Sequence, residues 1–156
     1  MPRKITERTI RQGATLEADA TIAQAVMTLR DSGMPALAVV NDRAVLVGLF
    51  GYREFFAALF PGYLRSLHSA SYLTASLDEA LEKRSECKSE PVADWMLADH
   101  VEATAESSDL DLAEKFLHHR AGVIPVVNRD RHVTGYVTQV DFFNELAGEF
   151  VSQPDP

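Results

Sequence analysis

Two stretches of the sequence, 87 residues apart, each combine a short apolar run with polar side chains that would begin a helix. The later one, GYVTQVDFF, carries Thr138 and, three residues on, Asp141. At the N-terminus of a helix, backbone N–H groups and the helix dipole favour a phosphate, and a threonine hydroxyl adds a donor. An ionised aspartate accepts hydrogen bonds only and can take both hydroxyls of a ribose. The pair therefore suits a nucleotide, although the same residues also make an ordinary helix N-cap.

The elements that would position this pair occur twice. Helical apolar spacing links Ile22, Ala25 and Leu29, and we align these residues with Leu110, Ala113 and Leu117. Thr21 with Gln24 forms a capping-box pattern, Ser107 or Ser108 offers a second N-cap, and Gly33 and Gly122 are expected to end the two helices in a left-handed conformation. The remaining predicted elements are strands at 36–40 and 45–50, a helix at 53–60, strands at 123–127 and 132–137, and a helix at 141–150.

This duplication predicts an α+β fold with two pseudo-symmetric β-α-β-β-α motifs packed as one module. Each motif, of about 50 residues, exposes too much apolar surface to be stable alone, so the two must share a core. We expect the first motif at residues 5–60, a helical connector at 61–90, the second motif at 91–150 and a C-terminal tail at 151–156. The connector is expected to contribute one or two extra helices.

Composition excludes several classes of protein. The chain of 156 residues is 46% hydrophobic and 24% charged, and no apolar run reaches the roughly 18 residues of a membrane span. A net charge of −8 without a basic cluster argues against nucleic-acid binding. The N-terminus lacks the apolar segment of a secretion signal, and the single cysteine, Cys87, fits a reducing compartment. We therefore expect a cytoplasmic protein that binds neither membrane nor nucleic acid.

Catalytic and metal chemistry find little support in the sequence. The five histidines do not show metal-ligand spacing with Cys87, lack an obvious carboxylate partner, and are interpreted as solvated side chains: His68, His100, His118, His119 and His132. Cys87 stands in a charged run and is expected to be an inert surface thiol. No nucleophile elbow, Walker loop or dinucleotide fingerprint is present. We therefore predict no metal site, no required cofactor and no enzymatic activity.

Two copies of a helix, an apolar strand (IPVV in the second copy), a turn and then Gly-apolar-apolar-Thr-x-x-Asp resemble paired CBS domains, the modules named after cystathionine β-synthase. The resemblance implies a stand-alone, non-catalytic regulatory module that binds AMP, ADP, ATP or S-adenosylmethionine and signals to a protein partner. It also implies a homodimer, for which apolar helix faces are available at Phe55, Phe56, Phe142 and Phe143. The alternative is a structural or dimerisation module whose ligand pockets have decayed.

The resemblance also implies two symmetry-related pockets. The first would join Thr138 and Asp141 to residues from the other motif: Thr9, Ala14, Met34, Pro35 and Ala36. The second would contain Gly51, Glu54, Leu97, Glu102, Gly122 and Val123. It departs from the family pattern because Gly51 lacks a hydroxyl, Glu54 is one methylene longer than aspartate, and Glu102 is negative. We therefore expect one ligand per chain, in the first pocket, with AMP preferred to ATP because no cation stands at Gly122 or Val123.

Overall fold

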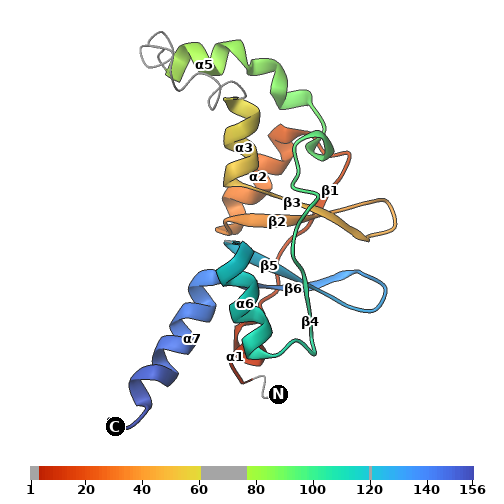
Figure 1. Cartoon of the computed structure of the whole chain (residues 1–156). Coiled ribbons are helices and arrows are strands. Elements are labelled where there is room, and N and C mark those ends of the chain that lie inside the picture. The colour runs from red at the N-terminus through yellow and green to blue at the C-terminus, as the bar shows by residue number, and fades with distance from the viewer. Residues whose placement is uncertain (1–3, 61–76, 120) are drawn as a thin grey trace.

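The computed structural model describes residues 4–60, 77–119 and 121–156, and these form two motifs stacked on each other (Figure 1). The first motif contains β1 (Leu16–Glu17), α2 (Ile22–Ser32), β2 (Ala36–Val40), β3 (Leu46–Gly51) and α3 (Tyr52–Leu59). The second contains β4 (Ala103–Thr104), α6 (Asp109–His119), β5 (Val123–Val127), β6 (Val133–Thr138) and α7 (Gln139–Ser152). The predicted α+β class and the β-α-β-β-α order of each motif are confirmed.

Each motif builds one three-stranded sheet, in the order β1-β2-β3 or β4-β5-β6. The short first strand runs parallel to the middle strand, which is antiparallel to the third. Local details repeat at the same 87-residue spacing. Ala44 and Arg131 are the two described non-glycine residues with positive φ, at 62° and 63°, and each lies in the turn that joins the two longer strands. The repeat therefore extends to backbone conformation.

The helix predictions hold for α2 and fail in part for α6. In α2 the capping box of Thr21 and Gln24 is present, and Gly33 ends the helix with a φ of 68°. In α6, however, Leu110 and Leu117 are 65% and 75% exposed. The buried residues are Leu112 and Phe116, 87 positions after Ala25 and Leu29. Our alignment of these helices was one residue out of register, which turned the expected apolar face toward solvent.

Two further details of the second motif refine the sequence prediction. Ser108 rather than Ser107 acts at the start of α6, where its hydroxyl accepts the N–H of Asp111 at 3.1 Å. Gly122 does not adopt the expected left-handed conformation, since Gly33 is the one glycine with positive φ among the described residues. Gly122 instead offers its carbonyl to the N–H of Gln139, the first residue of α7, at 2.9 Å. It therefore links the start of β5 to the start of α7.

The N-terminal helix α1 (Lys4–Thr9) was not expected from the sequence, and it packs on the second motif although it precedes the first. Ile5 belongs to the apolar core formed by the second motif. Arg8 pairs with Glu145 at 3.1 Å and with Glu149 at 2.9 Å on α7. The first part of the chain therefore crosses the second motif before it enters its own sheet.

The connector is described only from residue 77 onward, and the rest of the expected helical content, at 61–76, lies outside the described residues. It contains α5 (Leu77–Lys83) and a 3₁₀ helix (Ser85–Ser89), followed by a second 3₁₀ helix (Val92–Asp94). Cys87 is only 3% exposed. The expectation of a surface thiol was therefore wrong, because the 3₁₀ helix that carries Cys87 packs against α2.

Candidate functional site between the two motifs

Thr138 and Asp141 begin α7, as the sequence predicts, and both already have partners. Thr138 is 6% exposed, and its hydroxyl oxygen accepts the N–H of Asp141 at 3.1 Å, which makes it an N-cap. The Asp141 carboxylate accepts a hydrogen bond from Arg11 Nε at 2.7 Å and forms an ion pair with the same guanidinium. A ribose that bonded to this carboxylate would compete with Arg11.

Two of the residues expected to complete the first pocket, Thr9 and Ala14, bond within the protein. Thr9 is buried, and its hydroxyl donates to the carbonyl of Ile5 at 3.0 Å. The carbonyl of Ala14 accepts the phenolic hydroxyl of Tyr136 at 2.6 Å. The same phenolic oxygen accepts the N–H of Ala38 at 2.9 Å. The Tyr136 side chain therefore reaches from β6 across to β2 and to the segment that precedes β1.

The Tyr136 ring leaves little free space beside that segment. Tyr136 is fully buried, and a Cβ added at Gly13 would lie 2.9 Å from its ring carbons. At the pseudo-symmetric position in β3 stands Leu49, a shorter side chain without a polar end. The two residues form equivalent backbone bridges, Tyr136 with Arg11 and Leu49 with Leu97. The two halves of the molecule therefore share a backbone frame but differ in how much of it is filled.

The remaining predicted residues lie at the beginning of β2. Met34 is buried in the core at 3% exposure. Pro35 and Ala36 line a cavity on the Glu54 side of the interface, together with Gly122 and Val123. A Cβ at Gly122 would lie 3.5 Å from Pro35, so the starts of β2 and β5 are in contact. Pro35 and Ala36 thus stand at the junction of the two motifs.

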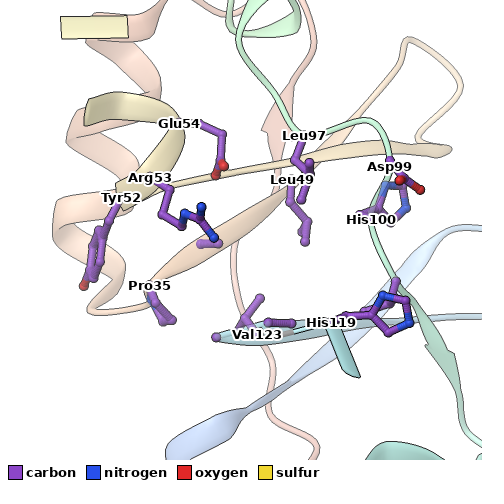
Figure 2. A pocket seen from close by; sticks show the side chains of 14 residues that line it. Pro35, Leu49, Tyr52, Arg53, Glu54, Leu97, Asp99, His100, His119 and Val123 are labelled. Atoms are coloured by element: carbon purple, nitrogen blue, oxygen red, sulfur yellow. The ribbon is translucent and has the colours of Figure 1, made fainter. Parts of the chain in front are cut away.

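This cavity has a volume of about 210 Å³ and corresponds to the second predicted pocket (Figure 2). It opens where the start of α3 faces the segment that precedes β4. Four residues predicted for the second pocket line it: Glu54, Leu97, Gly122 and Val123. Leu49 lies in the wall, where Tyr136 stands in the other half of the molecule. The volume is below the roughly 300–1,000 Å³ of most small-molecule sites, so a nucleoside phosphate would extend from it into solvent.

Glu54 holds the start of α3 while facing the cavity. Its carboxylate accepts the N–H of Gly51, the N-cap residue, at 2.9 Å, whereas at the start of α7 the N-cap Thr138 accepts the N–H of Asp141 through its own hydroxyl. Burial raises the pKa of the Glu54 carboxyl. A Cβ at Gly51 would overlap the carbonyl oxygen of Pro35. The absence of a hydroxyl at Gly51 is therefore required by packing in this half of the molecule.

Three basic side chains of the cavity were not found by sequence reasoning: Arg53, His100 and His119. They come from α3, from the segment before β4 and from the end of α6, and Figure 2 shows them around the cavity with Glu54 and Asp99. None of these three side chains stands at position 122 or 123, the two positions where a cation was expected. The backbone bridges make Leu97 the pseudo-symmetric equivalent of Arg11. Three residues further on, His100 and not Glu102 is therefore the equivalent of Ala14. That register was the signal that the sequence alignment missed.

Glu102 does not line the cavity but contacts His100, which does. One carboxylate oxygen lies 3.3 Å from His100 Nε2 and accepts a hydrogen bond from Arg131 at 3.0 Å. The expectation that His100 is a solvated side chain without a carboxylate partner was wrong, since its side chain is only 7% exposed. Among the described residues, no group of three or more His, Cys, Asp or Glu side chains is arranged to hold a metal ion.

The cavity thus brings together two carboxylates, three basic side chains and an apolar floor at the junction of two helices and two sheets. This combination can accept hydrogen bonds from hydroxyl groups through Glu54 and can attract an anion through Arg53. None of the described helices is both long enough and apolar enough to cross a lipid bilayer. The geometry would suit a small polar molecule.

Comparison with solved structures supports the fold assignment. A CBS-domain-containing protein from Agrobacterium tumefaciens matches with a TM-score of 0.65 and 18% identity over 90% of this chain and 88% of that one. CBSX2 in complex with AMP matches with a TM-score of 0.68 and 15% identity over 96% and 99% of the two chains. A Methanocaldococcus jannaschii protein, a putative archaeal homolog of g-AMPK, gives a TM-score of 0.71 and 20% identity over 89% of this chain and 48% of that one.

A search of the curated proteins gives no match. The family profile of the CBS domain, in contrast, matches residues 8–61 and 92–148, which together make up most of the chain. These two segments contain the sheets and the helices α2, α3 and α6 in full, so sequence and architecture agree. The protein belongs to the CBS-domain family and carries its two motifs in tandem.

Proposed function

We propose that this tandem CBS module is a cytoplasmic, non-catalytic sensor that binds an adenosine-containing ligand and signals its level to a partner protein. One observation carries the proposal: the interface between the motifs contains a cavity where Glu54 and Arg53 begin α3. A carboxylate for ribose hydroxyls beside a cation for a phosphate is a combination suited to a nucleotide. The similar fold of CBSX2, solved with AMP, is consistent with this ligand class.

We place the ligand in the cavity of Glu54 rather than beside Asp141. Arg11 neutralises Asp141, and the Tyr136 hydroxyl occupies the backbone N–H of Ala38 and the carbonyl of Ala14. The prediction of a pocket at Thr138 and Asp141, completed by Thr9, Ala14, Met34, Pro35 and Ala36, stays open as a second location. A ligand there would have to displace Arg11 and cost the Arg11–Asp141 ion pair, whereas the cavity of Glu54 needs no such displacement.

The ligand is tested first by thermal denaturation with AMP, ADP, ATP, NAD and S-adenosylmethionine. A ligand that binds only the folded state at 100 times its Kd stabilises the protein by about 2.7 kcal/mol. For a chain of this size the melting temperature should then rise by about 5 to 10 °C. Calorimetry with the best ligand should give one site per chain.

The location is tested by two matched substitutions at pseudo-symmetric positions, Glu54→Gln and Asp141→Asn. Glutamine still caps α3, so the first variant keeps the fold but loses a charged acceptor. We expect Glu54→Gln to weaken binding by about tenfold, since charge-assisted hydrogen bonds are worth about 1.5–3 kcal/mol, and Asp141→Asn to leave it unchanged. The reverse pattern would assign the ligand to the Thr138 pocket.

The second candidate function, a dimerisation module with decayed pockets, is favoured by the exposed apolar face of α7. Phe143, Leu146 and Phe150 are 64%, 46% and 78% exposed along one side of this helix, which extends away from the sheets in Figure 1. We infer that the face mediates a twofold homodimer, the commonest closed assembly. If none of the five ligands raises the melting temperature while the protein sediments as a dimer, the structural role replaces the sensor.

A further inference from the structure

Arg84 joins the connector to the far end of the helix that begins at the cavity. Its Nε donates a hydrogen bond to the carbonyl oxygen of Ala58 at 3.0 Å, across 26 positions of the chain. Ala58 is fully buried and lies in the last turn of α3, where helix carbonyls lack partners within the helix. A guanidinium at this end also interacts favourably with the helix dipole. Arg84 therefore closes the C-terminal end of α3, beside the connector in Figure 1.

The same guanidinium belongs to a cluster with Glu90 and Trp95. Its Nη2 lies 3.6 Å from one carboxylate oxygen of Glu90, and its central carbon lies 5.8 Å from the centre of the Trp95 ring, within the range of a cation–π contact. The indole N–H of Trp95 donates to the other carboxylate oxygen of Glu90 at 2.6 Å. Because these three side chains hold one another, a displacement of Arg84 changes the surroundings of the indole ring.

The cluster is also connected to the cavity along the chain, because Trp95 is two residues from Leu97. Leu97 and Leu49 exchange two backbone hydrogen bonds, of 3.0 and 2.7 Å, and both residues line the cavity. Met96, between Trp95 and Leu97, packs so closely on β3 that a Cβ at Gly48 would lie 2.6 Å from its sulfur. The segment from Trp95 to Leu97 is therefore fixed to the wall of the cavity.

The other connection runs through α3 and covers about one helical turn. Glu54 lines the cavity, and Ala58 follows it by four residues, about 6 Å along the helix axis. Packed helices and hydrogen-bond networks of this kind carry energetic coupling between sites. A ligand that moves Arg53 or Glu54 at the start of α3 therefore changes the bond between Ala58 and Arg84 at its end.

We propose that Arg84 is a positioning residue for the cavity and the link through which ligand binding reaches the connector. The inference deepens the proposed function and rests on it for the ligand. Arg84 does not line the cavity, so it acts through α3 and Trp95. Because coupling between two sites is reciprocal, a contact that transmits ligand binding also contributes to the affinity for the ligand. The partner protein would then respond to the connector and not to the cavity itself.

The experiment uses Trp95, the single tryptophan of the chain, as the reporter. Its fluorescence is recorded for wild type with each of the five ligands of the thermal panel. Trp95 does not line the cavity, so a bound ligand should change its emission through the cluster, since indole emission responds to nearby charges. In Arg84→Gln the same ligand should bind about fivefold more weakly, at the lower end of typical couplings, and should leave the emission unchanged.

Two further variants separate this role from a general loss of stability. Arg84→Lys keeps the positive charge and a donor, so it should restore part of the affinity and part of the change in emission. Arg43→Gln replaces an exposed arginine in the turn between β2 and β3, and it should behave as wild type in both measurements.

A second readout needs no ligand. Glu54→Ala removes the carboxylate that accepts the N–H of Gly51 at the start of α3. This variant should shift the emission of Trp95 in the unliganded protein, at a temperature well below unfolding and with an unchanged circular dichroism spectrum. Asp141→Ala, the matched change at the start of α7, should leave the emission unchanged, and an equal shift in both variants would contradict the route through α3.

The outcomes distinguish the coupling from the sensor function. When a ligand binds, an unchanged emission of Trp95 or an unchanged affinity of Arg84→Gln overturns the coupling, while the sensor function stands. When none of the five ligands binds, the sensor function fails and Glu54→Ala decides alone. A shifted emission in that variant keeps the coupling, and an unchanged emission overturns it as well.

Discussion

Replacing Tyr136 by phenylalanine should destabilise the whole module, because one hydroxyl group joins three segments of the chain. It donates to the carbonyl of Ala14 at 2.6 Å and accepts the N–H of Ala38 at 2.9 Å. Tyr136 and Ala38 are both fully buried, so no water replaces the lost partner of the Ala38 N–H. Ala14 is exposed, and its carbonyl can turn to solvent. The substitution therefore strands one buried donor and removes one further hydrogen bond.

The size of the effect follows from these two groups. A buried donor without a partner costs about 1–3 kcal/mol, and a replaceable hydrogen bond contributes about 0.5–1.5 kcal/mol. We expect the free energy of unfolding to fall by about 2 to 3 kcal/mol, which for a chain of this length lowers the melting temperature by about 4 to 12 °C. The ring itself stays in place, so no cavity term is added.

Urea denaturation followed by circular dichroism measures this difference, with Tyr52→Phe as the control. Tyr52 is 49% exposed, so its hydroxyl can be lost within about 0.5 kcal/mol. A loss below about 0.5 kcal/mol for Tyr136→Phe as well would refute the reasoning, since it would mean that Ala38 finds another partner.

Alkaline pH provides an independent check on the same residue. Burial raises the pKa of Tyr136 to about 12. A group whose pKa is raised by folding stabilises the protein below its unfolded pKa of about 10 and loses that contribution as pH rises toward the folded value. From pH 10 to 11, wild type should therefore lose up to about 1.4 kcal/mol more than Tyr136→Phe. Equal losses in the two proteins would mean that the Tyr136 hydroxyl is not buried.

Four further substitutions test other parts of the fold. Partial burial of Asp109 opposes its negative charge, but the hydrogen bonds that it accepts from the start of α1 outweigh this effect and lower the pKa of its carboxyl. Asp109→Asn should lower the free energy of unfolding by about 1 kcal/mol at pH 7. The difference in stability between the two proteins should disappear as acidification protonates the wild-type carboxyl. Gly51→Ala should destabilise by about 1–3 kcal/mol because its Cβ would overlap Pro35, whereas Gly148→Ala, in open space on α7, should stabilise by about 0.5–1 kcal/mol in the same urea titration. Phe143→Asp should convert the proposed dimer to a monomer in sedimentation velocity without lowering the melting temperature of the monomer, and an unchanged sedimentation coefficient would exclude the α7 face.

The local pattern of the sequence was enough for the fold. Apolar runs, turn residues and caps act over a few neighbouring positions, so β2 and β5 begin and end at the predicted residues. The third strands begin one residue later than expected, as strand ends do when pairing rather than composition sets them. The wrong prediction in α6 has a different cause. An alignment that is one residue out of register still predicts the helix, but it turns the expected apolar face by about 100° around the helix axis.

The candidate site, in contrast, depends on which side chains meet across the interface, and local pattern does not specify that. Thr138 and Asp141 match the nucleotide-binding pattern better than Gly51 and Glu54 do. In the fold, however, the Asp141 carboxylate is paired with Arg11, 130 residues away in the chain, and the Tyr136 ring fills the space beside it. Glu54 has the weaker motif, but the shorter Leu49 leaves room beside it.

What the sequence by itself determined is therefore the duplicated CBS architecture, because each element follows from contacts within a few residues. Only the tertiary structure decided which half of the duplication stays open and which basic groups face the opening. His100 precedes β4 and His119 ends α6, and only the tertiary packing brings both to the same cavity. Side-chain volume at two equivalent positions, Leu49 and Tyr136, is the physical reason that two similar sequences leave different amounts of space at the interface between the motifs.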